Sequence, residues 1–300
     1  MGEVTLRTSG KVRPLWVALV LILGFMAVEV GGAVVTGSLA LLADAGHMVA
    51  DAGAIGAAIW AISLARRPPA RHWSYGLPRA EIVAAAGNGV TLLVVAGLVL
   101  QTAIRRLVHP PAVAGLGVVE VACAGIVVNL AATWVLRNAD MASLNVEGVV
   151  RHVATDLAAF VATAIAGGIV DVTGFDRADP IASLLVVIIM VHSSWELLAA
   201  SGRILLEGAP ESVNVVEVRD HILQMPEVLA VHDLHAWTLT SDLPVLSAHV
   251  VVSDECWATG QAGPLLDRLQ ECLQGHFDLG HSTFQLEPAS HVGHEEGVHD

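Results

Sequence analysis

Six long apolar stretches fill the first two thirds of this chain and constrain its fold more than any other feature. Each exceeds the ~20 residues that an α-helix needs to cross the hydrocarbon core of a bilayer. Backbone N–H and C=O groups cannot stay unpaired in lipid, so such segments fold as helices. The sequence therefore predicts an α-helical membrane protein with six transmembrane helices, at Leu15–Val35, Leu39–Leu64, Glu81–Leu107, Gly115–Leu136, Val146–Val170 and Ile181–Leu206.

The first stretch has a basic start, at Lys11 and Arg13, which is also typical of a secretory signal peptide. Its apolar core is longer than the roughly 7–15 residues of a cleavable signal. We therefore expect it to be a retained membrane span.

The last part of the chain has no comparable apolar run, and its pattern alternates between helical and strand periods. This order predicts a small ferredoxin-like α+β (αββαβ) domain. Two domains are thus expected, a transmembrane domain over residues 1–206 and a cytoplasmic domain over residues 207–300. The predicted elements of the second are a helix, two strands, a helix and a strand, at Val213–Gln224, Val228–Thr240, Val245–Val252, Gly263–His276 and Ser282–Glu287.

Lysine and arginine side chains gather on one side of the predicted spans. If the N-terminus is cytoplasmic, nine of these residues before residue 207 lie on the inner side and three lie on the outer side. Cytoplasmic segments carry the excess of Lys and Arg, so both termini are predicted to be cytoplasmic. The compact loops favour a bacterial plasma membrane as the location of this integral membrane protein.

Residues 207–300 hold 16 acidic and two basic residues, so they account for the whole formal net charge of −14. Such an imbalance argues against nucleic acid as a partner and favours cations. A solvated acidic surface would explain the charge equally well.

A spacing of His-x-x-x-Asp occurs twice inside the apolar stretches, at His47 and Asp51 and again at His152 and Asp156. Residues four apart lie on one face of a helix, about 6 Å apart along its axis. Ionisable groups at membrane depth are costly and usually mark an ion or proton pathway. Two facing helices would supply two imidazoles and two carboxylates, a set that suits Zn²⁺ or a similar divalent ion. His192, in the sixth stretch, is interpreted as a core histidine.

The absence of thiolates from this set predicts an exchangeable ion, because thiolate sites hold zinc very tightly. Histidine binds metal only in its neutral form, and its reference pKa is about 6.5. Protons therefore compete with metal at the same atoms, which would allow H⁺ to act as the counter-ion.

These motifs resemble those of the cation diffusion facilitator family, and the resemblance covers nearly the whole chain. It implies a six-helix, homodimeric, proton-coupled exporter of divalent cations, with His47, Asp51, His152 and Asp156 as the transport site between the second and fifth helices. Histidine at position 47 resembles the zinc-preferring branch, with Cd²⁺ and Co²⁺ as further ions. The resemblance rests on the segments Gly37–Asp51, His72–Glu81, Asn145–Asp156, Val231–Trp237, Leu246–His249 and His281–Glu287.

The same resemblance implies metal ligands in the cytoplasmic domain. His235, His249 and His281 are the first candidates, followed by His232 and Glu287, and by His72 in the loop after the second span. His232 and His235 are three residues apart, so on a regular strand they would point to opposite faces.

Two other classes of function compete with a transporter. A membrane-embedded metal enzyme is disfavoured because the chain lacks H-E-x-x-H and the two His/Asp pairs leave no evident catalytic base. A membrane metal sensor or buffer that does not transport is compatible with the same residues. Flux measurements separate this alternative from a transporter.

Overall fold

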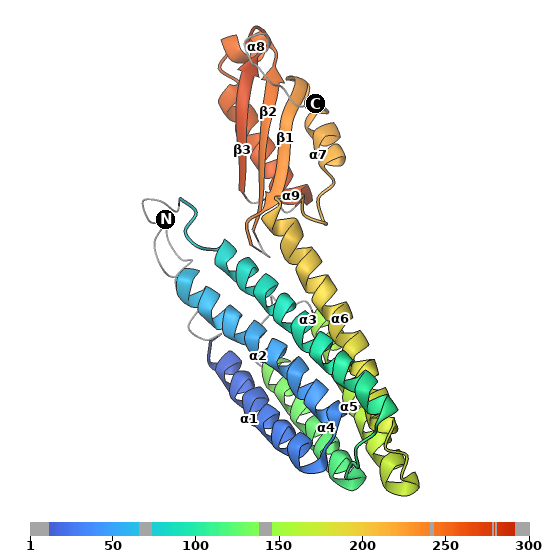
Figure 1. Ribbon diagram of the computed structural model, residues 1–300. Helices are drawn as coiled ribbons and strands as arrows, with labels where there is room; N and C mark the ends of the chain where they lie inside the picture. Colours follow the sequence, from blue (N-terminus) through green and yellow to red (C-terminus); the bar gives the residue numbers. More distant parts are fainter. Residues whose placement is uncertain are drawn as a thin grey trace. The chain divides into compact units, whose positions relative to one another are not determined.

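The computed structural model describes residues 12–65, 74–137, 146–240, 243–277, 279 and 281–291. The chain divides into two compact units, residues 1–199 and residues 200–300. Figure 1 shows a helical unit and a smaller unit of helices and strands.

Six long helices make up the first unit within the described residues, as the sequence predicted. Five of them, all except α2, are long and apolar enough to cross a membrane. Helix α2 has 27 residues, a membrane-spanning length, and carries Asp44, His47 and Asp51. The helices are α1 (Val12–Thr36), α2 (Leu39–Ala65), α3 (Arg79–Val108), α4 (Gly115–Arg137), α5 (Val146–Thr173) and α6 (Ala178–Leu205).

Helix α2 packs against α1, α3 and α5, while α4 packs against α1 and α5. Buried residues of α2, α3, α5 and α6 form one apolar cluster, which includes Leu39, Leu92, Ala159 and Met190. Many large apolar side chains point outward instead, as expected where acyl chains rather than water cover the surface.

A buried carboxylate fixes the start of α2. The turn between α1 and α2 is only Gly37 and Ser38, and Gly37 has φ +74°, a left-handed conformation that glycine adopts easily. Asp179 of α6 accepts hydrogen bonds from the backbone N–H groups of Leu39 (2.7 Å) and Ala40 (3.2 Å). These N–H groups have no partner within the helix, so the carboxylate caps α2 and ties it to α6.

Glycines let α4 and α5 approach closely. A Cβ atom on Gly125 would lie 2.3 Å from Cε1 of Phe160. Near the start of α4, a Cβ atom on Gly115 would lie 2.4 Å from the carbonyl oxygen of Gly167. The two helices pack at a distance that larger residues at these positions would not allow.

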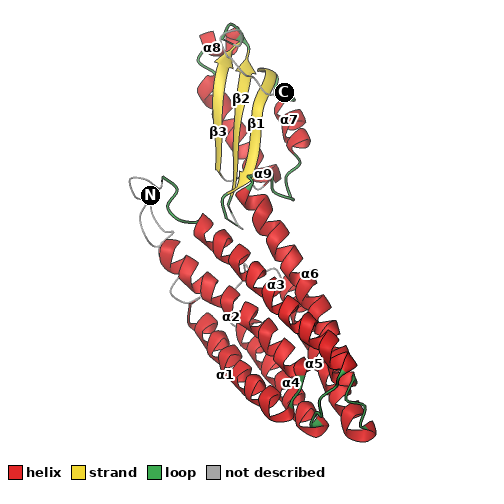
Figure 2. Ribbon diagram, in the orientation of Figure 1, coloured by secondary structure: helices red, strands yellow, loops and turns green. Residues whose placement is uncertain are grey.

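The second unit is the predicted α+β domain, in the predicted order αββαβ with one additional short helix, α8 (Figure 2). Strand β1 pairs with β2 antiparallel, and β2 pairs with β3 parallel in the order β1-β2-β3. The parallel pair requires a crossover, which α8 and α9 provide. The elements are α7 (Val215–Ile222), β1 (Val228–Thr238), β2 (Pro244–Val252), α8 (Asp254–Ala258), α9 (Ala262–Phe277) and β3 (His281–Pro288).

Helices α7 and α9 pack on one face of the sheet. Ile222 of α7 and Leu269 of α9 share a single core with Ala248 and Val250 of β2. Neighbouring residues on a strand point to opposite faces, so His249, between these two, lies on the face away from the helices.

Candidate metal centres

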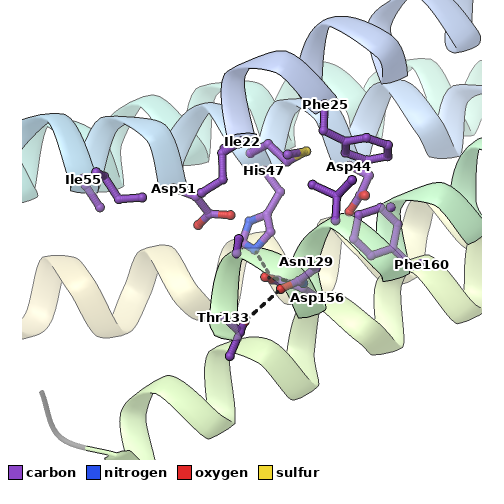
Figure 3. A pocket seen from close by; sticks show the side chains of 15 residues that line it. Ile22, Phe25, Asp44, His47, Asp51, Ile55, Asn129, Thr133, Asp156 and Phe160 are labelled. Carbon is purple, nitrogen blue, oxygen red and sulfur yellow. Dashed lines mark hydrogen bonds and ion pairs between the residues drawn. The ribbon is translucent and has the colours of Figure 1, made fainter. Parts of the chain in front are cut away.

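Three of the four predicted intramembrane ligands meet between α2 and α5 (Figure 3). His47 and Asp51 come from α2 and Asp156 from α5, and one ligand atom of each lies within 4.8 Å of the other two. Nε2 of His47 is 3.4 Å from Oδ1 of Asp156. Tetrahedral zinc with bonds of ~2.0–2.2 Å places two ligand atoms about 3.3–3.5 Å apart. The spacing fits one small ion.

The fourth predicted ligand, His152, lies on α5 one turn before Asp156. Its side chain is outside the described part of the structure. Residues four apart share a helix face, so its place in the ligand set stays a prediction.

Two polar residues of α4 form a hydrogen-bonded chain to the Asp156 oxygen that does not face His47. The amide of Asn129 donates a hydrogen bond of 3.0 Å to Oδ2 of Asp156, and the hydroxyl of Thr133 donates to Oδ1 of Asn129 at 3.4 Å. The bond leaves Oδ1 of Asp156 directed at His47 (Figure 3). Hydrogen bonds to ligating carboxylates typically fix their orientation and tune ion affinity. This pair was not predicted from the sequence, although two polar residues one turn apart in an apolar span are a recognisable signal.

Two cavities meet at the cluster. One of about 220 Å³ lies between α1, α2, α4 and α5, and Phe25 and Phe160 form part of its apolar wall. The other, of about 580 Å³, lies between α2, α3, α5 and α6. His47 and Asp51 line both cavities, so the cluster can be reached from either one.

His192 is not the core histidine that sequence analysis expected. Its side chain is 72% exposed, and its Nε2 lies 3.5 Å from Oε1 of Glu196, one turn further along α6. Both residues line the larger cavity together with Asp51. The interpretation is wrong because Glu196, four residues further on, gives the imidazole a polar partner on the exposed face of α6.

A second cluster forms in the second unit, the α+β domain, from three residues that the sequence predicted as metal ligands. His232 of β1, His249 of β2 and Glu287 of β3 offer ligand atoms within 4.8 Å of one another. Nδ1 of His249 is 2.7 Å from Oε1 of Glu287, and Nε2 of His232 is 3.5 Å from Oε2 of the same carboxylate. Glu287 is buried, so these imidazoles surround a carboxylate that water scarcely reaches.

The expectation that His232 and His235 point to opposite faces was wrong, because β1 is not regular between them. The pairing with β2 shifts register there, and Asp233 has φ +47°, as in a β-bulge. The Asp233 carboxylate consequently reaches both rings, with Oδ2 3.1 Å from Nδ1 of His232 and Oδ1 3.9 Å from Nε2 of His235.

The other predicted cytoplasmic ligands are not part of this cluster as far as the described residues show. His235 is 57% exposed beside it. His281 is the exposed first residue of β3. His72 lies outside the described residues.

The apolar helices, and the ionisable side chains gathered between them, define an integral membrane protein with a cytoplasmic domain. Residues 15–206 match the cation efflux transmembrane domain, and residues 210–289 match the cytoplasmic domain of cation efflux proteins. The chain belongs to this cation efflux family, also called the cation diffusion facilitator family, and it is a transporter rather than an enzyme.

Curated bacterial relatives align over most of the chain. The zinc transporter ZitB of Escherichia coli (strain K12) is 38% identical over 266 residues, which cover 88% of this chain and 83% of that protein. The metal cation efflux system protein CzcD of Cupriavidus metallidurans is 38% identical over 281 residues, 94% of this chain and 88% of that protein. The cadmium, cobalt and zinc/H(+)-K(+) antiporter of Bacillus velezensis is 33% identical over 279 residues, 92% of this chain and 88% of that protein.

Proposed function

We propose that this protein exports divalent metal cations, Zn²⁺ first and also Cd²⁺ and Co²⁺, from the cytoplasm in exchange for protons. The observation that carries the proposal is the His47–Asp51–Asp156 cluster, which lies between helices and lines two separate cavities. A site that two cavities reach is accessible to an ion, as binding and release during transport require.

The ligand chemistry supports both the ion and its release. Imidazole with carboxylate suits zinc-like ions, whereas sets of oxygen alone suit manganese and magnesium better. The cluster has no thiolate, so the ion can exchange. Metal binding requires neutral histidine, so a proton that arrives at His47 or His152 displaces the ion. The relatives' names, a zinc transporter and a cadmium, cobalt and zinc/H(+)-K(+) antiporter, agree with this choice of ions.

The remaining parts of the proposal concern the whole assembly. His152 would complete the intramembrane ligand set. Residues 1–206 would carry the transport function, and residues 207–300 would form the cytoplasmic domain of a homodimer in a bacterial plasma membrane, with both termini inside. There the His232–His249–Glu287 cluster would bind regulatory Zn²⁺. His235 and His281 of the same domain, and His72 of the loop after the second span, stay predicted ligands outside this cluster.

Zinc uptake into proteoliposomes with an imposed pH gradient tests this function. We expect His47→Ala to abolish uptake and His109→Ala to leave it unchanged, since His109 is exposed between α3 and α4. Zinc binding to the detergent-purified protein is measured in parallel. If wild-type protein binds zinc at the cluster but moves none, the protein is a sensor or buffer and the transport proposal is wrong.

A further inference from the structure

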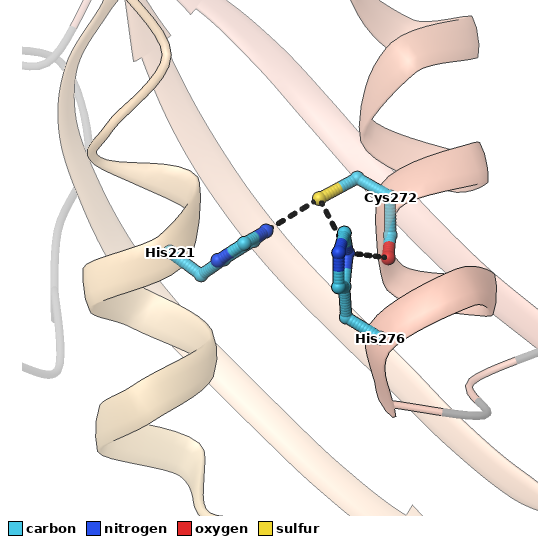
Figure 4. Close-up of side chains that lie close together, drawn as sticks. All are labelled: His221, Cys272 and His276. Atoms are coloured by element: carbon cyan, nitrogen blue, oxygen red, sulfur yellow. Dashed lines mark hydrogen bonds between the residues drawn. The ribbon is translucent and has the colours of Figure 1, made fainter.

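A third group of potential metal ligands lies on the helices of the cytoplasmic unit. His221 of α7 faces Cys272 and His276 of α9 (Figure 4), and the three offer ligand atoms within 4.8 Å of one another. The group contains a thiol, which the other two clusters do not.

Local structure brings these side chains together. Leu265, Leu269 and Leu273 of α9 are fully buried against the sheet and fix the rotation of the helix. Cys272 and His276 are one turn apart and therefore share a flank of the helix. That flank faces α7, where Ile222, next to His221, is packed in the same core. Both helices are thus held in place by apolar contacts that do not involve the three side chains.

The distances suit a single small ion. Nε2 of His221 is 2.8 Å from Sγ of Cys272, and Nδ1 of His276 is 3.7 Å from the same sulfur. Zinc bonds of about 2.3 Å to sulfur and ~2.0–2.1 Å to nitrogen at tetrahedral angles place S and N about 3.5 Å apart. The two observed distances bracket this value, and small side-chain rotations would equalise them.

A role as a reactive thiol fits less well. Burial raises the pKa of the Cys272 thiol, whereas a nucleophilic or redox-active cysteine needs a lowered pKa. Cys272 forms no disulfide in the structure, where all three cysteines are free thiols, and Cys256 of the same unit is buried in the core cluster. A metal ion, in contrast, can displace the thiol proton.

We propose that His221, Cys272 and His276 form a metal-binding site for soft ions, Zn²⁺ and more strongly Cd²⁺, on the helical face of the cytoplasmic unit. Three protein ligands leave a fourth position open, as in exchangeable or catalytic sites rather than closed structural ones. The site is distinct from the His232–His249–Glu287 cluster, which lies on the opposite face of the sheet. A bound ion would join α7 to α9. This inference stands independently of the proposed transport.

Cadmium titration of the full-length protein in detergent tests the site. Cd²⁺–thiolate bonds absorb in the ultraviolet by charge transfer, so this signal reports a cysteine ligand. The transport cluster and the His232–His249–Glu287 cluster contain no thiol and contribute nothing to the signal. We expect one saturable equivalent per chain in the wild type, and no signal with Cys272→Ser. Cys123→Ser and Cys256→Ala are the matched controls and should retain the full signal.

The imidazoles are tested separately. Removing one hydrogen-bond partner of a metal ligand typically weakens affinity by ~10–100-fold, so loss of a ligand itself in His221→Ala or His276→Ala should weaken cadmium binding by more than about 100-fold. His276 is exposed, so His276→Ala leaves the core intact and keeps the test meaningful if Cys272→Ser misfolds. Repetition in an Asp51→Ala background, which disables the transport cluster, should leave the signal unchanged. No charge-transfer signal in the wild type, or one that survives Cys272→Ser or is unchanged by His276→Ala, would overturn the proposal.

Discussion

Removing the amide of Asn129 should weaken zinc binding at the transport cluster. Asn129 donates a 3.0 Å hydrogen bond to Oδ2 of Asp156, a bond from a neutral donor to a charged acceptor. Such bonds contribute about 1.5–3 kcal/mol. At about 1.4 kcal/mol per factor of ten, the loss corresponds to ~10–100-fold weaker binding, the range seen when hydrogen-bond partners of metal ligands are removed.

The assay is the zinc concentration that gives half-maximal flux in proteoliposomes, compared between variants whose cytoplasmic clusters are all unchanged. Asn129→Leu keeps the branched shape of the side chain without its polar atoms and Asn129→Ala removes that shape, so agreement between the two variants separates the hydrogen bond from packing. Thr133→Val is the graded control. The Thr133 hydroxyl is 3.4 Å from a neutral acceptor. Loss of this hydrogen bond should cost at most ~1 kcal/mol and change the zinc concentration for half-maximal flux less than about fivefold. Half-maximal concentrations for both Asn129 variants within a factor of two of wild type would refute the reasoning.

Three further predictions concern packing, capping and access. Gly125→Ala places a Cβ 2.3 Å from the Phe160 ring; it should cost ~1–3 kcal/mol by overpacking and lower the thermal midpoint in detergent. Gly24→Ala places its Cβ in open space and should leave the thermal midpoint unchanged. Equal midpoints for Gly125→Ala and the wild type would contradict the close packing of α4 on α5. Asp179→Ala removes the acceptor for the Leu39 and Ala40 N–H groups, and a lost helix cap of ~1–2 kcal/mol should lower the thermal midpoint. Asp171→Ala, at an exposed position, is the control and should leave the midpoint unchanged. A midpoint of Asp179→Ala equal to that of the wild type would show that the cap does not stabilise α2. The double variant His192→Ala, Glu196→Gln removes charge from the larger cavity. It should raise the zinc concentration for half-maximal flux roughly 2–5-fold, because the cation is attracted less strongly, and zinc binding should be retained. Unchanged flux kinetics would exclude that cavity as a route.

The order of elements could be predicted from the sequence because it depends on local patterns. Apolar runs near the length of a bilayer identified the six helices, and the change from period 3.6 to period 2 identified the strands. The short α8 was missed because five residues leave too little periodicity to detect. Helix α6 begins at Ala178 rather than at the predicted Ile181, because Asp179 belongs to its first turn. A carboxylate next to an apolar run is typical of a loop, so the sequence pattern places the helix start too late.

The candidate sites were predictable only where a motif repeats on one helix. His47 and Asp51 could be paired with Asp156 because the same spacing occurs twice. The sequence could not predict that Asn129 contacts Asp156, since the contact depends on how closely α4 and α5 pack at Gly125.

In the cytoplasmic unit, a β-bulge and a contact between two helices could not be predicted from the sequence. The bulge at Asp233 reverses the expected orientation of a neighbouring histidine, and only the pairing with β2 reveals it. His221 and Cys272 lie 51 positions apart in the sequence, and their meeting depends on how α7 and α9 pack on the sheet. Tertiary contacts of this kind leave no signal in a single sequence.

Simultaneous recording of zinc and proton movement in proteoliposomes tests the central claim most directly. With zinc on one side and an imposed pH gradient, the wild type should move zinc one way and protons the other, and reversal of the gradient should reverse the zinc flux. Asp51→Ala should abolish both movements together. Zinc flux that ignores the pH gradient, or that persists in Asp51→Ala, would contradict a proton-coupled site at His47, Asp51 and Asp156.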